Sequence, residues 1–201
     1  MVFQATCTYA IISWAPTYFI RVHSWTAGQA GRSLAVIMMV LACSGMYLGG
    51  FLSDRWQKKG IADGLIRVAM ISAVGIFLFL TPAMLLSDAR WTLVMMAIGM
   101  FLLSFPMGVS VASLQLIFPN QVRGQVAALF LFFLNLGGQT MGPGFPGLLN
   151  DYLFHNENMV GASISLTVGV ASILMLLVFV ATMHPYHIHY QMMENAKTRS
   201  S

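Results

Sequence analysis

The chain has 201 residues, of which 58% are hydrophobic and only 8% are charged. Because a soluble globular domain carries about 25% charged residues, this composition excludes a water-soluble domain as the main part of the chain. The formal net charge of +4 does not indicate a nucleic-acid ligand either, because the cations are concentrated in short turns between long apolar stretches. We therefore expect the surroundings of the chain to be a lipid bilayer.

Six apolar stretches follow one another along the chain. A helix needs about 20 apolar residues to cross the hydrocarbon core of a bilayer, and it satisfies its own backbone hydrogen bonds there. The sequence therefore predicts an all-α, six-helix integral membrane bundle over residues 1–184 and a cytoplasmic tail over 185–201. The six predicted spans lie near 3–22, 31–53, 65–86, 91–117, 124–149 and 162–183.

The distribution of Lys and Arg predicts how these spans are oriented. Loops rich in Lys and Arg stay in the cytoplasm, and one side of the six-span arrangement carries most of these residues. That side holds Arg55, Lys58, Lys59, Arg67, Arg123, Lys197 and Arg199, whereas Arg21, Arg32 and Arg90 lie on the other. Both termini are therefore expected in the cytoplasm, and the membrane is expected to be the inner (plasma) membrane of a bacterium.

Two pairs of glycines predict where neighbouring helices approach each other. Gly45 and Gly49 in the second predicted span, and Gly138 and Gly142 in the fifth, have the small-xxx-small spacing that lets membrane helices pack closely. We expect a close helix crossing at each pair.

A faint internal repeat relates the second predicted span to the fifth. The pattern Gly-x-Leu-x-Asp ends at Asp54 in the second span and at Asp151 after the fifth, 97 residues further on, and the same offset relates Gly45 to Gly142. These two spans end on opposite sides of the predicted topology. The match therefore indicates three helices repeated upside down, which is how many secondary transporters are built.

The turn between the second and third predicted spans carries the most specific motif. Residues 50–59 read GFLSDRWQKK, and this resembles the loop signature of the major facilitator superfamily, which joins the second and third helices of each six-helix half. Gln57 occupies the position of the signature's second glycine, a departure that is commoner in C-terminal copies. The resemblance implies a membrane bundle that is one half of a transporter, built as a 3+3 inverted repeat.

The rest of the chain resembles a C-terminal half, helices seven to twelve, of the same superfamily. The stretch SWAPTYF at 13–19 is similar to the seventh helix of spinster-like and organic-anion members. Pro119, Arg123 and the pair Gly142-Pro143 are placed as in their eleventh helix. The resemblance implies a secondary active transporter that moves a small organic or amphipathic solute by alternating access, with an N-terminal six-helix half outside this chain as its partner.

The resemblance also implies a cytoplasmic gate at the basic turn. In that picture Asp54 locks the two halves by meeting the positive N-terminus of a helix in the other half, an interaction of about 0.3–1 kcal/mol when exposed. The alternative is that the cations only enforce topology, and Arg123 could instead anchor its helix to lipid headgroups. The gate residues are Gly50, Asp54, Arg55, Lys58, Lys59 and Arg123.

A further implication of the resemblance is that the first, fourth and fifth predicted spans line a central cavity. Polar side chains within these spans are candidates for solute contact, since polar groups are costly in lipid and face the bundle or a water-filled path. Asn135 and Gln139, four residues apart, are expected to share one helical face. An interhelical hydrogen bond is the alternative role for each candidate. The candidates are Gln4, Thr8, Trp14, Tyr18, Ser104, Gln115, Asn135 and Gln139.

Other functions are left open or disfavoured by particular residues. A stand-alone six-span half-transporter and a non-transporting remnant remain alternatives, whereas a channel is disfavoured because no selectivity-filter sequence or charged ring is evident. No enzymatic chemistry, cofactor or metal site is expected, since all five histidines lie in loops or the tail and Cys7 and Cys43 fall inside predicted spans. No Asp or Glu lies deep in a span, so any coupling proton is expected to use the other half.

Overall fold

Every element of the described chain is helical. The structure is a computed structural model that describes residues 1–59, 64–110, 121–156 and 159–199, with side chains placed up to residue 182. Its elements are α1 (Val2–His23), α2 (Ala27–Val36), η1 (Ile37–Ala42), α3 (Cys43–Lys58), α4 (Gly64–Gly75), η2 (Ile76–Leu80), α5 (Thr81–Ala83), α6 (Ala89–Leu103), α8 (Arg123–Leu148), η3 (Leu149–Phe154) and α9 (Val160–Arg199). The elements η1, η2 and η3 are π-helical. The predicted all-α class is confirmed.

Several of these elements join end to end into longer rods. In the described part of the chain, five rods are long and apolar enough to cross a membrane. They are Ala27–Lys58, Gly64–Ala83, Ala89–Ser110, Arg123–Phe154 and Val160–Thr182. The predicted first span forms a helix of 22 residues, α1, but it falls outside this group because side chains such as Gln4, Thr6 and Thr8 make it more polar.

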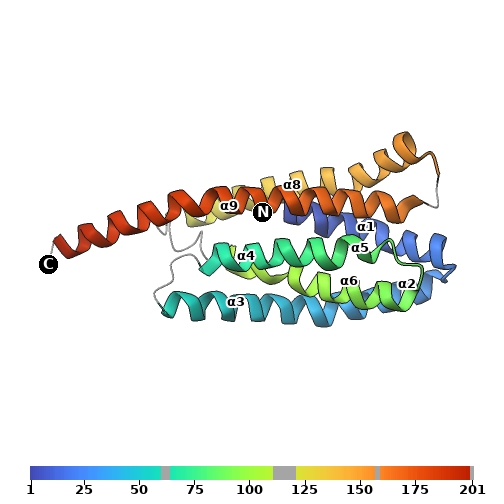
Figure 1. Cartoon of the computed structure of the whole chain (residues 1–201), viewed down its shortest axis with the longest axis horizontal. Coiled ribbons are helices and arrows are strands. Elements are labelled where there is room, and N and C mark those ends of the chain that lie inside the picture. Colours follow the sequence, from blue (N-terminus) through green and yellow to red (C-terminus); the bar gives the residue numbers. More distant parts are fainter. Residues whose placement is uncertain (60–63, 111–120, 157–158, 200–201) are drawn as a thin grey trace.

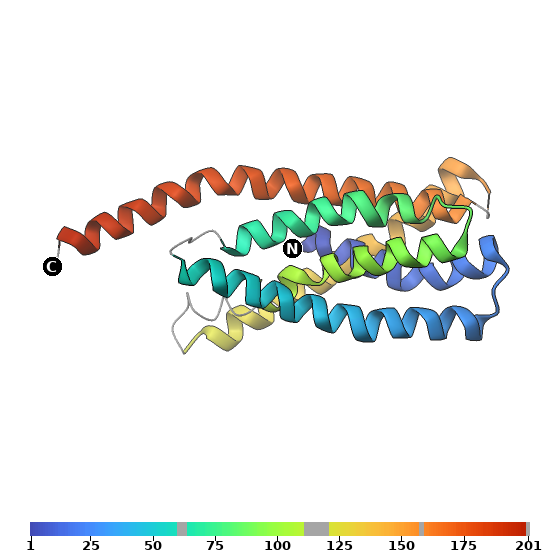
Figure 2. The same cartoon turned by 60° about the horizontal axis from the view of Figure 1, so that its bottom comes forward.

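The rods run side by side along the long axis of the molecule (Figures 1 and 2). At one end of the bundle α3 ends and α8 begins, and we call this the inner end; at the opposite end α2 begins and η3 ends, and we call this the outer end. Side-chain caps start two helices at the outer end. Thr26 Oγ1 accepts a hydrogen bond from the Gln29 backbone N–H over 3.3 Å, and Asp88 Oδ1 accepts one from the Arg90 N–H over 2.8 Å.

The core lies where α1, η2, α6 and α9 meet. Its fully buried side chains include Ile11 and Phe19 on α1, Leu80 on η2, Met96 on α6 and Ile164 on α9. In a bilayer, burial of apolar surface does not by itself drive helices together, because lipid tails are equally apolar. Dense packing of these side chains is therefore what distinguishes this arrangement from separated helices.

The first of the predicted glycine crossings joins α3 to the rod that begins with α6. Gly45 lies against the backbone carbonyl of Phe101, and Gly49 lies against that of Phe105. A Cβ atom at either glycine would overlap these carbonyl oxygens, so only glycine permits this approach. The close crossing predicted for this pair is confirmed.

Two rods are much less buried than the others. In Ala27–Lys58 and Arg123–Phe154, each 32 residues long, only 17% and 11% of an apolar 18-residue stretch is buried, against 44–50% in the other three rods. Both long rods therefore present wide apolar faces that no other described part of the chain covers. The candidate site described below lies on the uncovered face of Arg123–Phe154.

Candidate functional site

A group of polar side chains joins α1 to α8. The Tyr9 hydroxyl donates a hydrogen bond to Asn135 Oδ1, and Gln139 Nε2 donates one to the Tyr9 oxygen over 3.4 Å. Asn135 Nδ2 also donates to the Leu131 carbonyl oxygen over 2.8 Å, one helical turn earlier on α8. We call Tyr9, Asn135 and Gln139 the Tyr9 cluster. The expectation that Asn135 and Gln139 share one helical face agrees with this geometry, since both reach the same hydroxyl.

The second predicted glycine pair is what brings Tyr9 to this position. A Cβ atom on Gly138 would lie 2.9 Å from Cδ2 of the Tyr9 ring, and one on Gly142 would lie 2.9 Å from the carbonyl oxygen of Thr6. Both glycines therefore let α1 approach the backbone of α8 directly, and the close crossing predicted here is confirmed. Because Asn135 is three residues before Gly138, the amide and the glycine lie on neighbouring turns of one face.

The Tyr9 cluster opens to the outside of the bundle. Gln139 and Thr140 are exposed, and Asn135 is half-buried. A shallow hollow of about 600 Å³ runs along this face of α8, and its lining consists of Leu131, Phe132, Asn135, Leu136, Gln139 and Thr140. Each amide retains donors or acceptors beyond its described hydrogen bonds. The face can therefore hydrogen-bond a further molecule.

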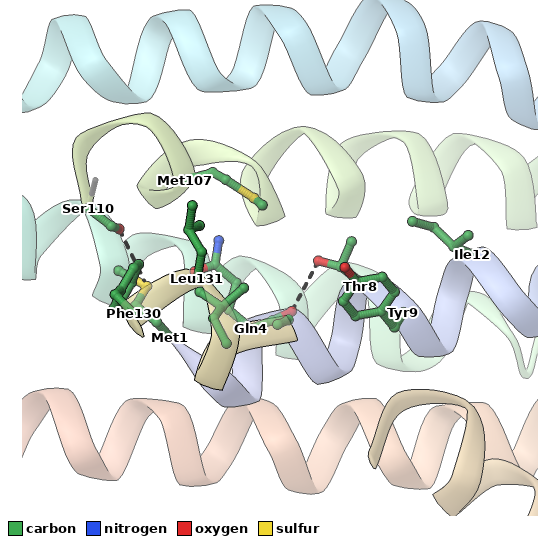
Figure 3. A pocket seen from close by; sticks show the side chains of 11 residues that line it. Met1, Gln4, Thr8, Tyr9, Ile12, Met107, Ser110, Phe130 and Leu131 are labelled. Carbon is green, nitrogen blue, oxygen red and sulfur yellow. Dashed lines mark hydrogen bonds between the residues drawn. The ribbon is translucent and has the colours of Figure 1, made fainter. Parts of the chain in front are cut away.

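An apolar cavity of about 250 Å³ adjoins the cluster (Figure 3). Its walls come from α1, from the continuation of α6 and from α8, and they comprise Met1, Gln4, Ala5, Thr8, Tyr9, Ile12, Met107, Ser110, Phe130, Leu131 and Leu134. Tyr9 belongs to both the cavity and the cluster. The site therefore combines an apolar cavity with uncharged hydrogen-bonding side chains at its edge.

The two predicted polar residues in this cavity already have partners. Gln4 is buried, and its Nε2 donates to the Leu103 carbonyl oxygen over 2.7 Å. Thr8 Oγ1 donates to the Gln4 carbonyl oxygen over 3.0 Å, an interaction drawn in Figure 3. Gln4 thus ties α1 to the rod that begins with α6, while Thr8 satisfies its hydroxyl on its own helix. Both line the cavity, and each has one described hydrogen bond to a backbone carbonyl oxygen.

Two other candidates lie elsewhere on α1. Trp14 Nε1 donates to the Pro143 carbonyl oxygen over 3.0 Å, which adds a second tie between α1 and α8. Tyr18 is 1% exposed, and its hydroxyl donates to the Leu86 carbonyl oxygen over 3.2 Å. Neither side chain lines the cavity or joins the Tyr9 cluster.

The candidates of the fourth predicted span do not join the cluster. Ser104 Oγ donates to the Met100 carbonyl oxygen over 2.9 Å, and its Cβ lies beside Gly45 at the crossing with α3. Gln115 lies outside the described residues. The part of this span that lines the cavity is instead Met107 and Ser110.

The predicted gate residues lie at the inner end. Asp54, Arg55, Lys58 and Lys59 are exposed near the end of α3, and Asp54 forms no ion pair within the described part of the chain. Arg123 is half-buried at the start of α8, at the same end of the bundle (Figure 2).

The glycines of this motif have different surroundings. Gly50, the first residue of the motif, has no atom near the place of a Cβ, whereas its neighbour Gly49 makes the close helix contact. The structure therefore assigns the packing role to Gly49 and leaves Gly50 on an open face.

Tyr9 is the site residue that the sequence-based list omits. Its residue type gives little signal, because Tyr in a membrane span serves equally as a packing or interfacial residue. A usable signal exists in the pairing of two spans: α8 carries an amide at 135, a glycine at 138 and an amide at 139 on one face. Such a face accepts an aromatic ring over the glycine with its hydroxyl between the amides.

Comparison with known proteins relates the whole arrangement to membrane transporters. Residues 1–143 match the family model of the Major Facilitator Superfamily. The chain is 26% identical over 156 residues to an MFS-type efflux pump of Mycolicibacterium smegmatis, a match that covers 75% of this chain and 35% of that protein.

The fold also matches a solved structure. The chain resembles the crystal structure of a bacterial homolog of the human lysosomal transporter Spinster, in an inward-facing and unoccupied conformation, with a TM-score of 0.63 and 19% sequence identity. This match covers 90% of this chain and 44% of that one. The chain thus spans less than half the length of either protein.

The family match includes the elements that carry the site. Residues 1–143 contain α1, the basic turn at 50–59 and all three residues of the Tyr9 cluster. The chain is therefore an integral membrane protein, and its apolar rods lie in lipid or against other protein. It belongs to the Major Facilitator Superfamily.

Proposed function

We propose that this chain is the C-terminal half of a secondary active transporter that moves a small organic or amphipathic solute by alternating access. The observation that supports this most is the exposure of Gln139 and Thr140 on α8. Both lie in the rod Arg123–Phe154, whose apolar 18-residue stretch is only 11% buried. Polar groups facing hydrocarbon are costly, so this face is expected to border a water-filled path and not lipid.

The partner that encloses this path is expected to be an N-terminal six-helix half. The two long rods supply the wide apolar faces on which such a half would pack, and the polar hollow along α8 lies on one of them. Solute sites in transporters built from repeats lie near the midplane, between the repeated units. Residues 135–140 fall in the middle of Arg123–Phe154, as that arrangement requires.

The chemistry of the Tyr9 cluster favours an amphipathic solute. Its members are a phenol and two amides, which donate and accept hydrogen bonds without carrying charge. The adjoining cavity would receive an apolar part of the solute, and the cluster would orient a hydroxyl, amine or carbonyl. The description of one relative as an efflux pump fits such a solute. A proton-coupling group, if the transporter uses one, is expected in the other half.

The inner end is proposed to be the cytoplasmic gate. Asp54 is exposed at a helix end, and Arg55, Lys58 and Lys59 surround it. This placement suits a carboxylate that meets the N-terminus of a helix in the other half, and the cations suit a cytoplasmic location with both termini on that side. We place the transporter in the inner membrane of a bacterium.

Labelling of one cysteine from both sides of the membrane tests this proposal. Thr140→Cys in a Cys43→Ser background leaves buried Cys7 as the one other thiol of this chain, and any cysteines of the other half are replaced by serine. In the complete transporter, a charged, membrane-impermeant thiosulfonate is expected to react at position 140 in right-side-out and in inside-out vesicles. Position 140 faces lipid, and the proposal fails, if it reacts from neither side. Reaction from one side alone contradicts alternating access.

A further inference from the structure

We propose that Asp151 is the outer counterpart of Asp54. It is a carboxylate at the outer end that binds the positive N-terminal end of a helix in the other six-helix half while the transporter faces inward. The inference rests on the proposed function, because the other half supplies the partner. It assigns a role to a residue that the cytoplasmic gate does not use.

The two carboxylates lie near the ends of the two equivalent rods of the inverted repeat. Asp54 lies near the end of Ala27–Lys58, and Asp151 lies near the end of Arg123–Phe154, 97 residues later. Both rods have 32 residues and both are far less buried than the rest. Figure 2 shows the end of α3 and the end of η3 at opposite ends of the bundle.

Packing supports this equivalence independently of the motif. Gly45 on the second predicted span contacts Phe101 on the fourth, whereas Gly142 on the fifth contacts Thr6 on the first. In a repeat of three helices, a contact of the second span with the fourth corresponds to a contact of the fifth span with the first. The glycines 97 residues apart therefore make corresponding crossings, which a chance match of common residues would not require.

The residues before the two carboxylates also correspond. Ser53 is fully buried and Asn150 is 6% exposed, and they precede Asp54 and Asp151 directly. Ser53 Oγ and Asn150 Oδ1 are both buried and have no hydrogen-bond partner among the described residues. Each exposed carboxylate thus directly follows a buried polar side chain. Buried polar atoms of this kind are few in native structures and call for an explanation.

The chemistry of Asp151 selects its partner. The side chain is exposed, and it forms no ion pair with the described residues of this chain. An anionic lipid headgroup would repel it, whereas a helix N-terminus presents unpaired N–H groups and a partial positive charge. Because Asp54 is proposed to meet such a terminus at the inner end, the repeat places the same interaction at the outer end. The two contacts would then alternate as the halves rock.

The test measures how each carboxylate biases the two access states. The reporter is Thr140→Cys with Cys43→Ser in the complete transporter, labelled by a charged thiosulfonate from each side in vesicles of both orientations. Asp151→Asn is expected to raise the outside labelling rate and lower the inside rate by about two- to fivefold, the factor that corresponds to one exposed carboxylate–dipole contact. Asp54→Asn is expected to shift both rates the opposite way.

Asp88→Asn is the matched control, because it neutralises another carboxylate at the outer end while Asn keeps the capping hydrogen bond of α6. It should leave both rates unchanged. The inference is overturned if Asp151→Asn changes nothing while Asp54→Asn shifts the rates, a result that leaves the proposed function standing. Equal shifts by Asp151→Asn and Asp88→Asn would also overturn it, since surface charge would then explain both. One-sided labelling in every variant would sink the proposed function itself.

Discussion

Removal of one hydroxyl group tests whether the Tyr9 cluster serves both packing and binding. Tyr9→Phe keeps the aromatic ring over Gly138 and deletes the two hydrogen bonds that link it to Asn135 and Gln139. An interhelical hydrogen bond in a membrane protein contributes about 0.6 kcal/mol on average. Two such bonds give about 1 kcal/mol, which corresponds to a fall in melting temperature of about 2–4 °C for a chain of this size.

A second measurement separates binding from packing. In the purified complete transporter, Tyr9→Phe should also weaken binding of an amphipathic solute about fivefold, because a loss of about 1 kcal/mol is a factor of about five. Tyr18→Phe is the control: it removes a buried hydroxyl that donates to Leu86 far from the cluster, so it should lower the melting temperature and leave affinity unchanged. Equal effects of the two variants on affinity would contradict a binding role for the Tyr9 cluster.

Three further predictions concern other parts of the bundle. Asp54→Asn should impair transport without preventing membrane insertion, and unchanged uptake kinetics in vesicles would contradict the gate. Gly142→Leu should lower the free energy of unfolding by about 1–3 kcal/mol because the leucine overpacks against α1, measured as thermal stability in detergent. Gly144→Ala should be tolerated because no atom lies within 4 Å of its Cβ position. Similar losses of stability in both variants would contradict the close crossing at Gly142. Burial lowers the pKa of His23, and the charge of Asp88 opposes part of this shift. The folded state therefore binds fewer protons than the unfolded state. Its stability is retained above the usual histidine pKa of about 6.5 and falls as the pH drops through the lowered pKa. The variant His23→Gln should abolish this loss of stability in melting curves recorded between about pH 7.5 and 5.

The sequence predicts best those features that depend on spacing along a single helix. The glycine pairs at 45 and 49 and at 138 and 142 are visible as i, i+4 repeats, and both mark close crossings. Asn135 and Gln139 share a face for the same reason. In each case the helical period alone determines which residues point together.

Features that depend on a partner helix cannot be predicted this way. Trp14 and Tyr18 have the residue types of a binding site, yet their polar atoms are bonded to the carbonyl oxygens of Pro143 and Leu86. Tyr9 looks like an ordinary packing residue until α8 is placed beside it. Likewise, the π-helical turn at Ile37–Ala42 consists of common apolar residues with no local sign of irregular backbone.

We propose that a second six-helix bundle covers the exposed faces of the two long rods. The mass of the native polypeptide in its membrane, measured with an antibody against an epitope within this chain, shows whether that second bundle exists. We expect a single polypeptide of roughly twice 22.0 kDa, because each half contributes one bundle. A native polypeptide of 22.0 kDa that carries out transport by itself would contradict it.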